Sequence, residues 1–255
     1  MPLNVDPETL ELIIKPGLAT RKDGECFIEV TSGEVQLHSR SATENVYFCE
    51  SIPISTIQQP LENVPNSCWV NLEDIADFLT VNTESDLRFT LPFETADAEF
   101  ILSDQSLTYR FGALNELSTH DPDPSPMGHT RTLCAIYQLD LSRSLQAADL
   151  LGDDMQIHII PEANHIEFLA SNSNRGESFT YTVPEDHIKF ICGRETEFNV
   201  EIDFLNEMSS SVLDNSIISL VLSDNSLKIA LEYPFPGSSL VVHLSRYLQK
   251  SEYRY

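Results

Sequence analysis

The sequence predicts an α+β protein built from two similar domains of antiparallel sheet, each with two short helices. Three observations lead to this prediction. Apolar–polar alternation dominates the chain, helical patterns are few and short, and a proline-rich break lies near the middle of the 255 residues. Alternation with a period of two indicates strands that face a core on one side, and the apolar stripe of a short helix can cover that side.

Four segments carry a helical pattern, two on each side of the break. The first begins with Asp6 as N-cap and Pro7 at the first helical position. The second, residues 71–79, places apolar side chains on one face behind Asn71, a second capping residue. The other two helices are expected at residues 140–151 and 202–208.

Strand pairs joined by tight turns fill the stretches between the helices. Asp104-Gln105 and Asp224-Asn225 have the chemistry of such turns. The expected strands cover residues 87–93, 99–103, 106–111, 217–222, 226–233 and 239–244.

The break itself covers residues 115–131. Pro122, Pro124 and Pro126 alternate within it, so it can form neither a helix nor a central strand. Such spacing favours an extended and fairly stiff linker. We therefore predict an N-terminal domain at residues 1–114, a connecting loop at 115–131 and a C-terminal domain at 132–255.

The two halves share a weak internal repeat at an offset of 131 residues. Val35 and Pro53 lie 18 positions apart, as do Ile166 and Pro184, and each stretch has a polar centre between alternating flanks. Both stretches predict a β-hairpin. Two unrelated hairpins could share these features, but the match in length, order and terminal proline favours duplication.

The charge balance narrows the function classes. Forty Asp and Glu oppose 15 Lys and Arg, a formal net charge of −25, which excludes an ordinary basic nucleic-acid patch. The acids are dispersed and only five lysines occur, which favours a protein that works in concentrated salt, where repulsion between carboxylates is screened. An ordinary acidic protein is the alternative.

Other features point to a soluble protein inside the cell. No apolar run is long enough to span a bilayer, and the first residues lack a secretory signal. The five cysteines are odd in number and form no C-x-x-C pair, as expected in a reducing compartment. We expect no membrane association and a cytoplasmic location.

Motifs of catalysis are missing from the sequence. It has no phosphate-binding glycine loop and no G-x-S-x-G elbow, and the seven histidines show no paired ligand spacing. His120, Asp121, Asp123 and His129 could in principle hold a metal, but exposed polar residues on a proline-rich loop rarely do. We expect no metal, no cofactor and no catalytic residues; a metal- or nucleotide-dependent enzyme remains the rival class.

Several segments carry a resemblance to a known family. They are N-L-E-D-I-A-D-F-L at 71–79, D-L-R-F-T-L at 86–91, L-S-R-S-L-Q-A-A-D-L-L-G-D-D at 141–154, I-D-F-L-N-E-M at 202–208 and V-V-H-L-S-R-Y-L at 241–248. In order and spacing they resemble the sliding clamps of archaea and eukaryotes, the proliferating cell nuclear antigen (PCNA) family. The sequence looks most similar to clamps of salt-loving archaea or their viruses.

The resemblance implies a DNA polymerase sliding clamp, a processivity factor without enzymatic activity. Three copies would close head to tail into a ring around double-stranded DNA, with the helices lining the hole. The homotrimer would tether the polymerase, the clamp loader and other replication and repair enzymes, whose plug peptides enter a groove. A clamp-like subunit of a heteromeric ring is the alternative. The linker at 115–131 lies where the family has its interdomain connecting loop.

The resemblance also implies site residues. The DNA-facing candidates are Arg143, Lys15, Arg21 and Lys22, although the last three also fit a solvated helix end. Other channel cations of the family are replaced by Asp77, Gln146, Asp203 and Ser211.

Two further surfaces follow from the family pattern. The partner groove would comprise Val46, Pro126, Met127, Leu244, Ser245, Arg246, Tyr247 and Leu248, of which Leu244 and Leu248 could equally serve edge-strand packing. Subunit contact would join residues 106–114 of one copy to 175–182 of the next, with Arg110, Arg175 and Phe179 taking part.

Overall fold

The computed structural model describes residues 2–5, 7–20, 25–31, 33–40, 46–53, 66–81, 87–90, 99–103, 108–112, 129–152, 154–211, 216–224, 226–233 and 236–245. The chain divides into two compact units. The N-terminal unit comprises residues 1–123 and 232–240, and the C-terminal unit comprises 124–231 and 241–255. The boundary falls within the predicted linker, most of which lies outside the described residues, so the domain limits stay a prediction.

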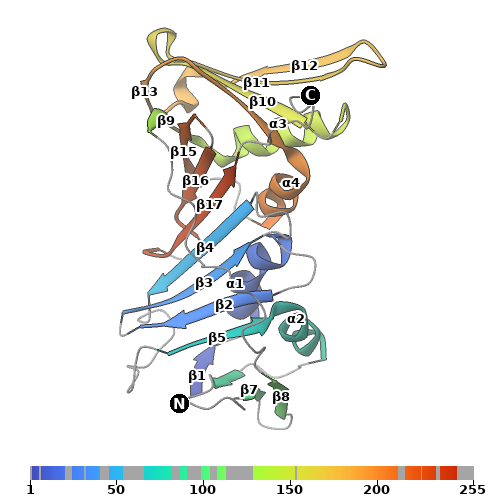
Figure 1. Cartoon of the computed structure of the whole chain (residues 1–255), viewed down its shortest axis with the longest axis vertical. Coiled ribbons are helices and arrows are strands. Elements are labelled where there is room, and N and C mark those ends of the chain that lie inside the picture. The colour runs from blue at the N-terminus through green and yellow to red at the C-terminus, as the bar shows by residue number, and fades with distance from the viewer. Residues whose placement is uncertain are drawn as a thin grey trace, which may run out of the picture. The chain divides into compact units, whose positions relative to one another are not determined.

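Two antiparallel arrays of strands form the N-terminal unit (Figure 1). The smaller sheet has the order β1 (Pro2–Val5), β6 (Leu87–Thr90), β7 (Glu99–Ser103) and β8 (Thr108–Gly112). The second array has the order β4 (Val46–Pro53), β3 (Glu34–Arg40), β2 (Glu25–Val30) and β5 (Asn66–Asn71).

Helices α1 (Pro7–Thr20) and α2 (Leu72–Val81) pack against each other in this unit. As predicted, α1 begins at Pro7, and the Asn71 side chain caps α2 by accepting a hydrogen bond from the Glu73 amide at 2.8 Å. Gly17 permits the close approach, because a Cβ there would lie 2.5 Å from Cδ1 of the fully buried Leu72.

The C-terminal unit repeats this plan. One sheet has the order β12 (Glu177–Thr182), β11 (His165–Asn172), β10 (Asp154–Ile160) and β14 (Thr196–Glu201). The other has the order β13 (Phe190–Gly193), β9 (Thr130–Tyr137), β15 (Ile217–Ser223), β16 (Ser226–Leu231) and β17 (Ser239–Ser245), of which β17 belongs to this unit from Val241 onward. The predicted α+β class, with two helices per unit, is confirmed.

Helices α3 (Gln138–Asp149) and α4 (Ile202–Ser211) pack against each other. The predicted start of α3 at residue 140 is wrong by two residues. Gln138 already belongs to the helix, because its amide donates to the Ser216 carbonyl and its buried side chain bonds Ser142 and Ser209. These tertiary bonds replace the side-chain cap that the sequence lacks.

Both stretches of the predicted repeat fold as hairpins with the same register. Val35 pairs with Ile52 in the β3–β4 hairpin, and the Val183 amide donates to the Ile166 carbonyl at 3.0 Å in the equivalent place. Among the described residues, no helix is both long and apolar enough to cross a bilayer.

Candidate functional site

Exposed side chains of the helices include two of the predicted DNA-facing cations. Lys15 is exposed on α1, where its Nζ lies 3.7 Å from the Glu11 carboxylate one turn earlier. Arg143 is exposed on α3. Arg21 and Lys22 lie outside the described residues.

Carboxylates outnumber these cations on the helices. The exposed acids of α1–α4 among the described side chains are Glu8, Glu11, Glu73, Asp74, Asp77, Asp149 and Asp203. Seven acids against two cations leave the exposed helix surface negative. Contact with DNA phosphates through such a surface depends on individual cations and not on the overall field.

A polar cluster that the sequence did not predict ties α3 to strand β12. Asp140 is fully buried and accepts a hydrogen bond from the Tyr181 hydroxyl at 2.6 Å. His187 Nδ1 lies 3.0 Å from the same carboxylate, and its ring packs edge-on against Tyr137. The only sign of this cluster in the sequence is that Asp140 is adjacent to Leu141, a residue of the apolar stripe that the helix buries.

Arg143 borders this cluster. Burial and the Asp140 carboxylate raise the pKa of Tyr181 above its usual value, and the nearby positive charge of Arg143 opposes the shift. Arg143 thus lies on the side of α3 that approaches β12. The cluster holds this strand to the helix through charge-assisted bonds.

Each four-stranded sheet has two terminal strands among the described residues, and β8 in the N-terminal unit and β12 in the C-terminal unit are one of each pair, the others being β1 and β14. Strands β8 and β12 contain, or adjoin, the residues predicted for subunit contact. Arg110 lies in β8, and Phe179 is half-buried in β12. Arg175 is exposed in the turn before β12, where its amide donates to the Asn172 carbonyl at 3.2 Å.

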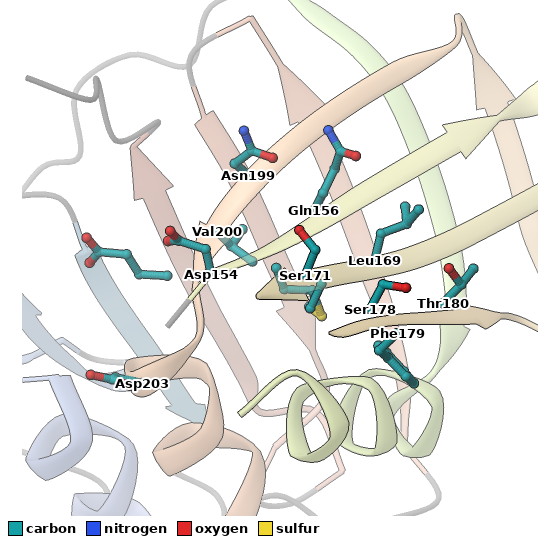
Figure 2. Close-up of a pocket in the computed structure, with 13 residues that line it drawn as sticks. Asp154, Gln156, Leu169, Ser171, Ser178, Phe179, Thr180, Asn199, Val200 and Asp203 are labelled. Atoms are coloured by element: carbon teal, nitrogen blue, oxygen red, sulfur yellow. The ribbon is translucent and has the colours of Figure 1, made fainter. Parts of the chain in front are cut away.

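A hollow of about 800 Å³ lies beside β12, over the ends of β10, β11 and β14 (Figure 2). Phe179 lines it from the edge strand, and Asp154, Glu201 and Asp203 contribute carboxylates. The described residues hold no group of three or more His, Cys, Asp or Glu placed to bind a metal ion.

Of the predicted groove residues, three lie within the part of the chain that the structure describes and five lie outside it. Val46 at the start of β4 and Leu244 in β17 are buried, with exposed fractions of 6% and 5%. Ser245 ends β17. Pro126, Met127, Arg246, Tyr247 and Leu248 lie outside the described residues, as do His120, Asp121 and Asp123, whereas His129 is exposed before β9.

Paired units of antiparallel sheet with two helices each define the fold of the DNA sliding clamps, and comparison with solved structures establishes that fold for this chain. PCNA of A. fulgidus, solved with the C-terminal region of FEN-1 bound, matches with a TM-score of 0.82 at 12% identity over 98% of this chain and 99% of that chain.

PCNA of Thermococcus kodakaraensis matches with a TM-score of 0.78 at 12% identity, over 96% of this chain and 99% of that one. The PCNA2–PCNA3 complex of Sulfolobus tokodaii contributes a chain with a TM-score of 0.75 at 14% identity, with 97% and 99% of the two chains covered. No protein-family model matches the sequence, and neither does any curated protein.

Proposed function

We propose that this chain is a DNA sliding clamp, a ring of three copies that encloses double-stranded DNA and tethers replication and repair enzymes. The observation that carries the proposal is the clamp fold over 98% of the chain. The ring has no chemistry of its own to perform, so it requires no catalytic residue and no cofactor. Its action is to keep a bound polymerase on the template.

The positions of β8 and β12 at the ends of their sheets support ring closure. When β8 of one copy pairs with β12 of the next, both open edges are satisfied, and repetition of this head-to-tail contact closes a ring. The cluster around Asp140 contributes by fixing β12 to α3 before a partner arrives. The Sulfolobus tokodaii complex of PCNA2 with PCNA3 supports a second candidate, a ring of different subunits.

The negative helix surface supports retention of DNA by topology and not by affinity. Lys15 and Arg143 can reach only a few phosphates, so counterion release would add little to binding. A ring does not need that contribution, because DNA leaves only through an opened interface or a free end.

Partner binding is the second part of the proposal. The structure of A. fulgidus PCNA with the C-terminal region of FEN-1 supports a peptide-binding groove. We assign this groove to Val46, the linker residues Pro126 and Met127, and residues 244–248. The polymerase and the clamp loader are the expected partners. The expected location is the cytoplasm and the nucleoid of a cell that lives in concentrated salt, whether the clamp is encoded by that cell or by its virus.

Light scattering after gel filtration tests ring formation. In molar KCl we expect a mass of about 86 kDa, three times the 28.7 kDa of one chain. Arg175→Glu should yield smaller species, whereas Arg194→Glu, in a surface loop away from β12, should not. A monomer at every salt concentration would exclude the homotrimer.

Retention on DNA tests the clamp itself. The protein, loaded onto a nicked circular plasmid by transient opening of the ring, should stay on the circle during gel filtration. It should leave when a restriction enzyme linearises the plasmid. Equal retention on both forms would refute topological binding.

A further inference from the structure

The outward face of the β13–β9–β15–β16 array differs from the rest of the surface. These strands lie in this order in the C-terminal unit (Figure 1). In β9, Thr132, Cys134 and Ile136 are fully buried, so the residues that alternate with them point away from the core. The same alternation holds in β15 and β16.

Three cross-strand rows make up this outward face. Two of its side chains are strongly exposed, Phe190 at 49% and Ile217 at 50%. The rows are Phe190, Ala135, Ser219 and Ala230; Cys192, Leu133, Val221 and Lys228; and Tyr137 with Ile217. None of these ten residues is acidic, in a chain that has 40 Asp and Glu.

Two other outward faces of the described sheets carry acids. The β2–β3 face of the N-terminal unit has Glu25, Glu29 and Glu34. The β10–β14 face has Asp154, with Glu201 as its cross-strand neighbour. The ten residues of the β13–β9–β15–β16 face differ from both of these faces, because they combine strongly exposed apolar side chains with an absence of carboxylates.

Cations border this apolar face. Lys189 lies with its Nζ 4.0 Å from the centroid of the Tyr137 ring, and Arg194 is exposed directly after β13. Lys228 belongs to the second row, opposite Val221. Asp224 forms an ion pair with Arg131 at one end of β9, and Lys189 Nζ donates to the Asp186 backbone carbonyl at 2.9 Å. Among the described residues, none of Lys189, Arg194 and Lys228 forms an ion pair with a carboxylate.

We propose that this face is a docking surface for an acidic segment of a partner protein that carries large apolar side chains. Its apolar residues would cover Phe190 and Ile217, which removes apolar area from water. Its carboxylates would meet Lys189, Arg194 and Lys228. Because the chain as a whole carries a net charge of −25, a local group of cations without carboxylates among the apolar rows would direct such a segment to this face.

A labelled peptide of alternating Glu and Leu or Phe tests the proposal by fluorescence anisotropy, with the full chain in the lowest salt in which it stays folded. Two control peptides replace Glu by Lys or the apolar residues by Ser. We expect Phe190→Ser to lower the affinity for the acidic apolar peptide about ten-fold, because one aromatic anchor is lost. Lys189→Glu should weaken it several-fold. Leu150→Ser, which changes another strongly exposed apolar residue, should leave it unchanged.

Circular dichroism will show whether Phe190→Ser is folded. If that variant unfolds, Ile217→Ser in the third row provides an independent test. Any of four results would overturn the proposal. The peptide could fail to bind, or Leu150→Ser could weaken it as much as the face variants do. Alternatively, Phe190→Ser could abolish self-association of the chain, which would assign the face to a second copy. Loss of DNA binding in Lys189→Glu alone would assign it to nucleic acid and equally refute the proposal.

Discussion

Glu50 gives the sharpest prediction about stability. It lies on β4 with no exposed surface, and neither carboxylate oxygen has a hydrogen-bond partner in the part of the chain that the structure describes. Burial raises its pKa well above the usual value for glutamate. The pKa of Tyr233 is raised as well, chiefly by its own burial and then by the charge of Glu50. The folded chain therefore keeps a proton at Glu50 that the unfolded chain releases.

The expected pH dependence follows from this difference. Below the unfolded pKa, about 4.3, both states are protonated and the stability is fully present. As the pH rises from there through the folded pKa, the free energy of unfolding falls by up to about 1.4 kcal/mol per pH unit. Each pH unit within this window therefore removes a noticeable share of the roughly 5–15 kcal/mol that stabilises a typical domain.

Denaturant unfolding of Glu50→Gln and the unmodified chain, at several pH values and constant salt, measures this effect. The variant should gain stability relative to the unmodified chain as the pH rises, because the amide that replaces the carboxyl group cannot ionise. Glu29→Gln, on the outward face of the same array, controls for the loss of one negative charge. A difference between the Glu50→Gln variant and the unmodified chain that stays constant with pH would show that Glu50 is not held protonated.

Two further predictions concern the C-terminal unit. Gly193 has a φ of 111°, and a Cβ there would overlap the Arg131 carbonyl, so Gly193→Ala should lower the free energy of unfolding by more than about 2 kcal/mol. Gly152→Ala, where a Cβ meets no atom, should be nearly neutral in the same urea titration. Tyr181→Phe removes a donor from the buried Asp140 and should cost about 1–3 kcal/mol by thermal unfolding; an unchanged midpoint would contradict the importance of that bond.

Local signals in the sequence were sufficient for most of the fold. Pro7 and Asn71 mark helix starts because their effects act within one turn, and the alternation of apolar residues on either side of a polar centre predicted both hairpins. The start of α3 was misjudged because Gln138 enters the helix through bonds to Ser216 and Ser209, far away in the chain. No local pattern contains that information.

The candidate site also has a part that the sequence predicted and a part that it did not. Arg143 and Lys15 were expected on exposed helix faces, and the periodicity that buries their neighbours places them there. The bonds among Asp140, Tyr181 and His187 join residues about 40 positions apart, which meet only when α3 packs on β12. The apolar outward face was missed because alternation shows that two faces differ but does not show that the solvent-facing one is apolar.

The salt dependence of DNA retention distinguishes the proposed clamp from an ordinary DNA-binding protein. A protein that holds DNA through phosphate contacts releases it as salt rises, since counterion release loses its value. A ring of three copies of a chain with a net charge of −25 behaves in the opposite way, because repulsion between subunits grows as screening weakens in dilute buffer. We therefore expect retention on circular DNA, followed by gel filtration between about 0.1 M and 2 M KCl, to increase with salt. Retention that falls with salt would mean that cations such as Arg143 hold the DNA, and a trimer equally stable in dilute buffer would refute adaptation to concentrated salt.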